Sequence, residues 1–221
     1  NFDDLDPLTA TPDVTVDIIE AGRPLPGDAD LVIIPGSKST IADLAHFRAQ
    51  GWDIDLQAHV RRGGHVLGIC GGYQMLGTKI IDDEGIEGLP SRVEGLGLLD
   101  VCTVMVPQKR LALSNATYLP TGDAVSGYEI HIGVTEGPDC TRAWLSLDGR
   151  GEGATSADGR VMGCYLHGLF AADAFRSAFL SNIGKPVTQH DYTQSVEDTL
   201  DALADHLETH MDIDSLLALA D

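Results

Sequence analysis

The sequence predicts an α/β protein with a doubly wound, mostly parallel sheet. Two short apolar runs, Leu31–Ile34 and His65–Ile69, are each followed by a stretch with helical periodicity. A continuous apolar run of this length is typical of a parallel strand that is covered on both faces. Strands that alternate with helices favour a doubly wound sheet. With 221 residues, 43% of them apolar, the chain is long enough for one domain with a full core.

The first 64 residues are predicted to contain a linker and a β-rich run ahead of the first buried strand, and two helices after it. Residues 1–13 are polar, contain two prolines and predict a linker or an entry into the domain. Residues 14–19 (VTVDII) form a short β-rich run ahead of the first buried strand. Residues 39–51 predict a helix with an apolar face and a terminal glycine, and residues 52–64 repeat that pattern.

Further helices and strands are expected along the rest of the chain. A helix is expected from Gly72 to Gly77, and another over residues 172–183. An acidic, amphipathic helical tail is expected over residues 191–221. Four further strand-like runs are Leu98–Val106, Val125–Ile132, residues 140–147 and residues 159–168.

Composition excludes several classes of partner and site. The formal charge is −20 with only 14 basic residues, so the surface would repel nucleic acid and anionic membranes, and neither is an expected partner. No apolar run approaches the roughly 18 to 20 residues of a membrane helix. The four cysteines contain no CxxC pair, so we expect no metal site and no disulfide framework, but reduced thiols in a cytoplasm.

A cysteine stands at the corner between the second buried strand and its helix. The sequence Gly68–Gly72 (GICGG) has the Gly-x-nucleophile-x-Gly form of a nucleophile elbow, a tight strand-to-helix turn that raises the middle side chain above the sheet. The first turn of the following helix, with its free N–H groups and positive dipole end, favours a thiolate. Cys70 is therefore the candidate nucleophile. The alternative is a small buried side chain in a glycine-rich turn.

A cysteine nucleophile needs a proton-transfer partner, and the chain has eight histidines. His167 closes the strand-like run at residues 159–168 and is followed by a glycine. Because the carboxyl ends of parallel strands form the crevice of such a sheet, Cys70 and His167 are expected to meet there. A core or surface position for His167 is the alternative.

Two backbone amides are candidates for an oxyanion hole. Gly36 lies in the turn after the first buried strand, and Gly71 follows the cysteine, so the N–H of Gly36, or that of Ser37, can join that of Gly71 around one oxygen. A tight turn without a catalytic role is the alternative. The segment GSKST, which begins at Gly36, lacks the spacing of a phosphate-binding loop, and a nucleotide site is not expected there.

Four motifs in order carry a family resemblance: PGSKST, GICGGYQMLG, GYEIHIGVT and GCYLHGLF. They closely resemble the glutamine amidotransferase domain of the cobyric acid synthase family, in the CobB/CobQ-type branch of the class I amidotransferases, over about residues 1–185. The resemblance implies a flavodoxin-like fold with a nucleophile elbow. It also implies a linker from an N-terminal synthetase domain (1–13), an amidotransferase domain (14–190) and a separate tail (191–221).

The resemblance implies a reaction as well. Cys70 attacks the side-chain amide of L-glutamine, His167 protonates the departing ammonia, and water hydrolyses the cysteinyl thioester. The ammonia would pass to the synthetase domain, where ATP and Mg drive amidation of adenosylcobyrinic acid a,c-diamide to adenosylcobyric acid. No cofactor is expected in the amidotransferase domain itself, and the corrinoid would bind the synthetase domain.

The resemblance also assigns substrate-binding residues. Gln74 matches a position that contacts glutamine in the class, and an exposed helix residue is the alternative. Glu129 and His131 share one face of a strand expected to line the site, with Glu129 a candidate for the substrate ammonium, and purely structural roles are the alternative. One departure is Leu169, which stands where many class I enzymes have the glutamate that orients the histidine. We therefore expect the isolated domain to be a slow glutaminase.

Other functions share parts of this pattern. Within the family, the chain could be the amidotransferase of another ligase, such as a cell-wall lipid II amidating complex or cobyrinate diamide synthase. A cysteine hydrolase of the α/β-hydrolase kind would also have an elbow, with an acidic residue placed before the histidine. A non-catalytic docking module is the remaining alternative, although the presence of both Cys70 and His167 argues against it.

Overall fold

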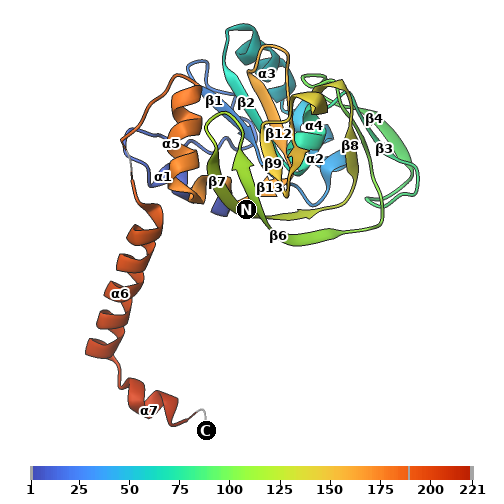
Figure 1. The fold of residues 1–221 in the computed structure, drawn as a ribbon. Coiled ribbons are helices and arrows are strands. Elements are labelled where there is room, and N and C mark those ends of the chain that lie inside the picture. The colour runs from blue at the N-terminus through green and yellow to red at the C-terminus, as the bar shows by residue number, and fades with distance from the viewer. Residues whose placement is uncertain (1, 189, 220–221) are drawn as a thin grey trace.

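A computed structural model describes residues 2–188 and 190–219 and shows a central parallel sheet (Figure 1). Its strand order is β1-β2-β12-β11, in which β1, β2 and β12 are parallel and β11 is antiparallel. The predicted α/β class is confirmed, while parallel pairing in this sheet is confined to its first three strands. Their bounds are β1 (Leu31–Ile34), β2 (His65–Ile69), β12 (Val161–Cys164) and β11 (Ala154–Thr155).

Both faces of the central sheet are covered, which explains why its strands are continuously apolar. Along β2, Leu67 and Ile69 enter one core cluster while Val66 enters the other. The first cluster contains Phe175 of α5, and the second contains Leu44 of α2. The helices are α2 (Thr40–Ala49), α3 (Trp52–Arg61), α4 (Gly71–Leu76) and α5 (Asp173–Asn182).

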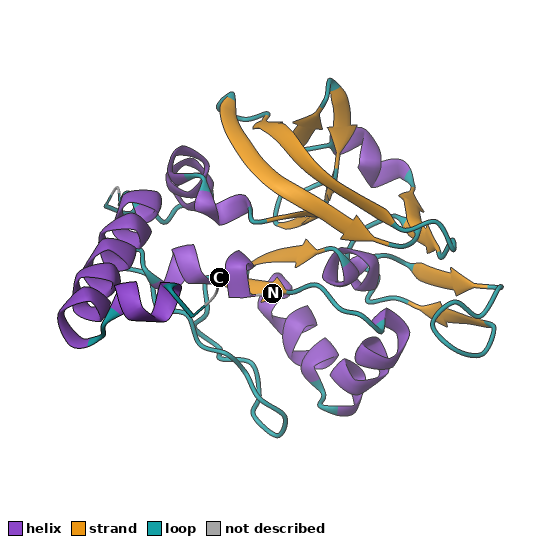
Figure 2. Ribbon diagram, turned by 90° about the horizontal axis from the view of Figure 1, so that it is seen from below, coloured by secondary structure: helices purple, strands orange, loops and turns teal. Residues whose placement is uncertain are grey.

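A second, antiparallel sheet lies beside the central one and is built around a long hairpin (Figure 2). Its strand order is β10-β9-β6-β7-β13. The run at residues 159–168 is two strands in two sheets, because the chain leaves the central sheet after β12 and pairs with β7 as β13. This change of sheet places His167 opposite Tyr128. The bounds are β6 (Arg110–Tyr118), β7 (Asp123–His131), β9 (Leu145–Leu147), β10 (Arg150–Glu152) and β13 (Leu166–His167).

A third sheet, of order β4-β3-β5-β8, lies at the end of the molecule away from α5 (Figure 1). Some expected strands differ from the structure: only Cys102–Val104 of the run 98–106 is a strand, and residues 140–147 divide between η2 and β9. Residues 14–19 lie outside any helix or strand. The bounds are β3 (Lys79–Asp82), β4 (Ser91–Glu94), β5 (Cys102–Val104), β8 (Val134–Glu136), η2 (Pro138–Arg142) and η3 (Leu169–Ala171).

The N-terminal segment packs against the domain. It contains the short 3₁₀ helix η1 (Phe2–Asp4) and α1 (Asp6–Thr9). Leu8 is 3% exposed and belongs to the core cluster that contains α5, and Asp4 is completely buried. The segment that the sequence predicts as a linker thus contributes to the interior.

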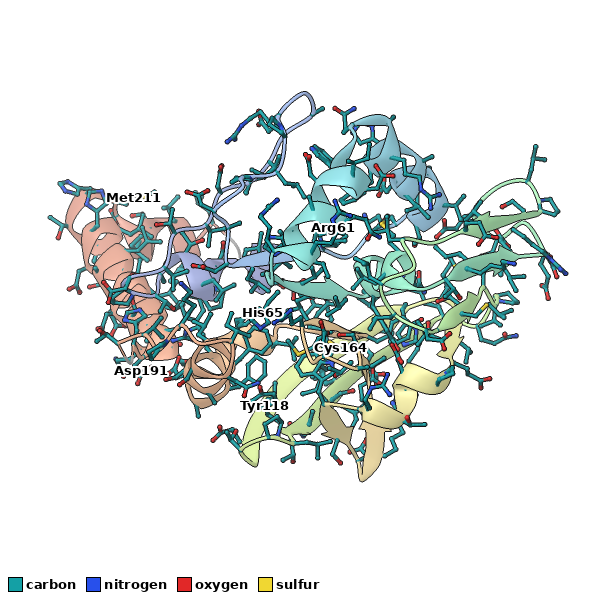
Figure 3. The ribbon with its side chains drawn as sticks, turned by 90° about the horizontal axis from the view of Figure 1, so that it is seen from above. Arg61, His65, Tyr118, Cys164, Asp191 and Met211 are labelled. Atoms are coloured by element: carbon teal, nitrogen blue, oxygen red, sulfur yellow. The ribbon has the colours of Figure 1, made fainter. Side chains whose placement is uncertain are left out.

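The C-terminal tail forms α6 (Tyr192–His210) and α7 (Ile213–Leu217), which extend away from the body (Figure 1). Asp191 caps α6 by accepting a hydrogen bond from the Gln194 backbone N–H at 2.8 Å. None of the α6 side chains is buried. In Figure 3, Asp191 and Met211 mark this extension, whereas Tyr118 and Cys164 lie in the body. Among the described residues, no helix is long and apolar enough to cross a membrane.

Candidate active site

Cys70 occupies a strained turn between β2 and α4. Its backbone has φ 53° and ψ −110°, a region that residues other than glycine rarely adopt. The flanking glycines are sterically required, because a Cβ on Gly72 would lie 1.9 Å from the Ile34 carbonyl oxygen. The thiol is 6% exposed and donates to the Ile130 carbonyl of β7 at 3.4 Å. The predicted nucleophile elbow is therefore present in the structure.

The structure brings His167 to Cys70, as the sequence predicts. Both side chains converge on Gly36: a Cβ added there would lie 2.7 Å from His167 Cε1 and 3.6 Å from Cys70 Cβ. The same position is 3.3 Å from His167 Nε2, so this nitrogen faces the turn after β1. A side-chain hydrogen bond joins His167 to Cys70.

A carboxylate orients the histidine from the opposite side. His167 Nδ1 donates to Asp4 Oδ2 at 2.8 Å, and the Gly168 N–H donates to Asp4 Oδ1 at 2.8 Å. Both carboxylate oxygens are thus engaged, and Asp4 is inaccessible to solvent. Leu169, at the position where many class I enzymes have glutamate, is buried in the core instead. Sequence reasoning missed Asp4, because no local pattern distinguishes it from the other acidic residues of the segment.

The carboxylate determines the charge of the histidine. Burial lowers the pKa of His167, but the hydrogen bonds and charges of Asp4 and Cys70 outweigh burial and raise it to about 9. His167 is therefore an imidazolium at neutral pH, next to the Cys70 thiol. Such an arrangement can attack a carbonyl carbon with sulfur and donate a proton to the leaving group.

Tyr128 covers the imidazole. Its ring stacks on His167 with centroids 5.1 Å apart and planes 11° from parallel. Its hydroxyl donates to Asp3 Oδ2 at 3.1 Å, so the residue next to Asp4 is also tied to this strand. Burial first, and then the hydrogen bond to Asp3, raise the pKa of Tyr128 to about 12, so the hydroxyl stays protonated at neutral pH.

Gly36 and Gly71, the predicted oxyanion donors, lie on two adjacent turns. A Cβ on Gly71 would lie 2.8 Å from the Ser37 backbone nitrogen, which shows how closely the turn after β1 packs on the start of α4. Gly71 is the first residue of α4, where backbone N–H groups have no acceptor inside the helix. The geometry agrees with an oxyanion hole, and its use as one stays a prediction.

Gln74 lies one turn into α4 and is 2% exposed. Its Nε2 donates to the Ile132 carbonyl at 2.8 Å and to the Tyr165 hydroxyl at 3.1 Å. Its Oε1 accepts from Thr40 Oγ1 at 3.1 Å. Both ends of the amide are thus bonded to the protein, so a contact with substrate glutamine stays a prediction.

Glu129 lies on β7 and is 1% exposed. Its Oε2 accepts from Arg110 at 2.7 Å and from Ser114 at 3.1 Å, and its Oε1 accepts from Arg150 at 3.3 Å. Burial raises the pKa of Glu129, but the arginines and Ser114 outweigh it and hold the pKa below its usual value. This carboxylate is ionised at neutral pH, as its predicted role at the substrate ammonium requires.

His131 shares the Glu129 face of β7, as predicted. Its ring stacks on Tyr165 with centroids 3.8 Å apart, and its Nε2 lies 3.8 Å from Glu129 Oε1. Burial lowers the pKa of His131 although Glu129 opposes this, so the ring is neutral at neutral pH. Its predicted contact with substrate stays a prediction.

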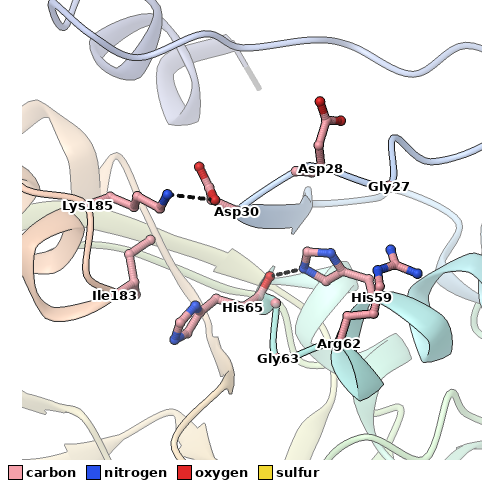
Figure 4. Close-up of a pocket in the computed structure, with 11 residues that line it drawn as sticks. Gly27, Asp28, Asp30, His59, Arg62, Gly63, His65, Ile183 and Lys185 are labelled. Atoms are coloured by element: carbon pink, nitrogen blue, oxygen red, sulfur yellow. Dashed lines mark hydrogen bonds and ion pairs between the residues drawn. The ribbon is translucent and has the colours of Figure 1, made fainter.

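A surface hollow lies far from Cys70 and His167. It measures about 340 Å³, and its lining includes Asp30, His59, His65 and Lys185 (Figure 4). Because His65 is the first residue of β2 and Cys70 follows its last, the hollow is at the opposite end of the strand. Within the described ranges, no group of three or more His, Cys, Asp or Glu residues is arranged to hold a metal ion.

The fold and this site define a class of α/β enzymes that use a cysteine at a nucleophile elbow with a strand-end histidine. Comparison with protein families specifies the class further. The family of CobB/CobQ-like glutamine amidotransferase domains matches residues 1–175. The chain belongs to this family.

Solved structures share the fold. A glutamine amidotransferase crystal structure aligns with a TM-score of 0.52 and 20% identity, over 70% of this chain and 79% of the other. The structure of PurLQS from Thermotoga maritima aligns with a TM-score of 0.50 and 18% identity, over 84% of each chain. At these identities the likeness concerns the fold alone.

Curated relatives are much more similar in sequence. Cobyric acid synthase of Ruegeria sp. (strain TM1040) is 66% identical over 221 residues, which are 100% of this chain and 46% of the relative. Cobyric acid synthase of Cereibacter sphaeroides (strain ATCC 17023) is 61% identical over 220 residues, with the same coverage. The chain thus spans about half the length of the curated relatives it matches.

Proposed function

We propose that this chain hydrolyses L-glutamine and supplies the ammonia for an ATP-dependent amidation that produces adenosylcobyric acid. The observation that carries the proposal is the line of three side chains, in which His167 bonds to Cys70 on one side and to the buried Asp4 on the other. The family supports glutamine as the substrate, and the relatives' name supports the corrinoid product.

In the first half-reaction, the Cys70 thiolate attacks the side-chain amide carbon of glutamine, and the carbonyl π electrons move to oxygen. The N–H groups of Gly36 and Gly71 stabilise the oxyanion, a contribution of a few kcal/mol in the transition state. The tetrahedral intermediate collapses as the C–N bond breaks, and the His167 imidazolium gives its proton to the departing nitrogen. The products are ammonia and a glutamyl thioester on Cys70.

In the second half-reaction, His167 is neutral and acts as a general base. It removes a proton from water as the water oxygen attacks the thioester carbon. The C–S bond then breaks, which releases glutamate and restores both the thiolate and the imidazolium. Asp4 keeps the Nδ1–H side of the ring fixed throughout, so that Nε2 faces the reacting atoms.

Substrate recognition falls to residues around β7 in this proposal. Glu129 provides the negative charge for the substrate ammonium, and Gln74 and His131 contact the substrate from the same side. The arginines that bond to Glu129 are about half exposed, while Glu129 itself is 1% exposed.

The remaining steps belong to the rest of the protein. We assign ATP, Mg and the corrinoid diamide to a synthetase domain of the same polypeptide, joined through residues 1–13 to an amidotransferase domain of residues 14–190, with residues 191–221 as a separate tail. The joining segment also packs into the amidotransferase domain, because Leu8 lies in its core and Asp4 bonds to His167. The relatives' greater length supports a further domain in such a polypeptide. The proposed compartment is the cytoplasm, since the four cysteines are all free thiols.

The test is a glutaminase assay on the complete polypeptide, with Cys70→Ser as the variant and Cys102→Ser as the matched control. The wild-type protein and the control should release glutamate. Cys70→Ser should lose at least about 10³-fold in rate, as expected when the nucleophile of a catalytic unit is removed. If glutamate release survives in Cys70→Ser, or is absent from the wild-type protein, the proposal fails and a docking role is left.

A further inference from the structure

The hairpin of β6 and β7 carries an exposed apolar face. Leu111 and Leu113 point outward from β6 and are 70% and 92% exposed. Across the hairpin they stand opposite Ile130 and Tyr128, and residues paired in this way share one face of a sheet. We call these four residues the hairpin face. Adjacent exposed leucines in the middle of a strand are typical of an interaction surface.

The hairpin face is continuous with the catalytic side chains. Leu113 pairs with Tyr128, and Tyr128 pairs with His167 on β13, so these three side chains form one row across the sheet. In the adjacent row, the Ile130 carbonyl accepts the Cys70 thiol hydrogen bond. Whatever covers Leu113 and Leu111 therefore lies directly beside the site where ammonia is released.

From these relationships we infer that the hairpin face is the docking surface for the synthetase domain of the same polypeptide. This inference rests on the proposed function and names the surface through which the two activities meet. The chain spans 46% of the cobyric acid synthase of Ruegeria sp. (strain TM1040), so more than half of such a polypeptide is available to cover the face.

The position of the N-terminal segment supports the synthetase domain as the partner of the hairpin face. Asp3 accepts a hydrogen bond from Tyr128, a member of the hairpin face, and the N-terminal end of the ribbon lies beside β7 and β13 (Figure 1). A synthetase domain joined ahead of these residues would enter at this edge of the hairpin.

The first test measures burial of the face directly and does not depend on turnover. Leu113→Cys and the control Leu89→Cys are introduced into the complete polypeptide, and maleimide labelling of each new cysteine is timed by mass spectrometry. Leu89 is a suitable control because it is 87% exposed and lies in the loop between β3 and β4, which belong to a different sheet from the hairpin. Labelling at position 113 should be at least tenfold slower, at every protein concentration. Equal rates, or protection that appears only at high concentration and so indicates a second copy, would overturn the inference.

The second test measures coupling between the two activities. In the complete polypeptide, Leu113→Glu should still release glutamate and should still amidate the corrinoid diamide with added ammonium chloride. Its glutamine-driven amidation, however, should fall at least tenfold per glutamate released, because the undocked face loses ammonia to solvent. Leu89→Glu should behave as wild type. Unchanged coupling in Leu113→Glu would refute docking at this face, whereas a wild-type protein without glutaminase activity would instead refute the proposed function.

Discussion

Asp4 Oδ2 accepts a hydrogen bond from His167 Nδ1 at 2.8 Å, between residues 163 positions apart in the chain. The contact completes a line of carboxylate, imidazole and thiol that resembles the catalytic triads of unrelated hydrolases in its roles. It differs from many class I enzymes in its source, because the acid comes from η1 and not from the position two residues after the histidine. Orientation of the histidine therefore depends on a segment near the edge of the domain.

Replacing Asp4 by asparagine should lower the glutaminase kcat by about 10² to 10⁴-fold, because the imidazole loses both its orientation and its charge partner. The pH profile should also change. In the wild-type protein the rate should fall as pH rises through about 9, where the His167 imidazolium loses its proton. In Asp4→Asn this fall should occur at lower pH.

The matched control for this variant is Asp6→Asn, an exposed change in the same segment. It should keep both the rate and the pH profile of the wild-type protein. A purely structural role for Asp4 would reduce the rate without moving the high-pH limb, and that result would contradict a role in positioning His167.

His167 should also make stability depend on pH. Its pKa is about 9 in the folded chain, against an ordinary value of 6.5, so the folded state binds the proton more tightly. The difference corresponds to about 3 kcal/mol of unfolding free energy. This contribution is fully present below pH 6.5 and is lost as pH rises through about 9.

Chemical denaturation of the wild-type chain and of His167→Gln at pH 6 and pH 9.5 measures the pH-dependent contribution of His167 to the unfolding free energy. The stability difference between the two proteins should shrink by about 3 kcal/mol at the higher pH. Other titrating groups contribute to both proteins and largely cancel in the comparison. A difference that stays constant with pH would mean that the pKa of His167 is the same in the folded and unfolded states, and a difference that grows with pH would mean that folding lowers it.

The sequence predicted the elbow and the histidine because each has a local signal. The glycines around Cys70 are required by contacts within the strand-helix turn, and His167 ends an apolar strand. Asp4 has no such signal: it is one of 34 acidic residues and stands in a polar segment with prolines. Only the tertiary contact with His167 and Gly168 identifies it.

The division of residues 159–168 into two strands also depends on a long-range contact. Val161–Cys164 and Leu166–His167 are both apolar and extended, so the hydrophobic pattern of the sequence predicts a single strand. The change of sheet at Tyr165 depends on pairing with β7, which comes from another part of the chain. Long-range pairing of this kind leaves no mark in the local pattern.

Glu129→Gln tests the substrate-binding assignment. If Glu129 holds the substrate ammonium, the KM for glutamine should rise about tenfold with little change in kcat, because the lost contact stabilises ground state and transition state alike. Steady-state kinetics measures both constants, with Glu136→Gln on the exposed edge of β8 as the control. A change confined to thermal stability would identify Glu129 as a counter-ion for Arg110 and Arg150 only.

Gly36 offers the sharpest steric test of the site. A methyl group added there would lie 2.7 Å from His167 Cε1, so in Gly36→Ala the imidazole must move. A displacement of about 1 Å can cost about 100-fold in rate, so kcat should fall by that order while the fold is retained. Gly27→Ala is the control, since its added Cβ would have no atom within 4 Å.

Gly72→Ala separates this catalytic effect from a structural one. Its Cβ would lie 1.9 Å from a backbone oxygen of β1, which cannot move as a side chain can, so this variant should lose thermal stability as well as activity. Gly36→Ala should lose activity only. If Gly36→Ala keeps the wild-type rate, the imidazole does not need its observed position, and the roles assigned to the Gly36 turn and to His167 would both be wrong.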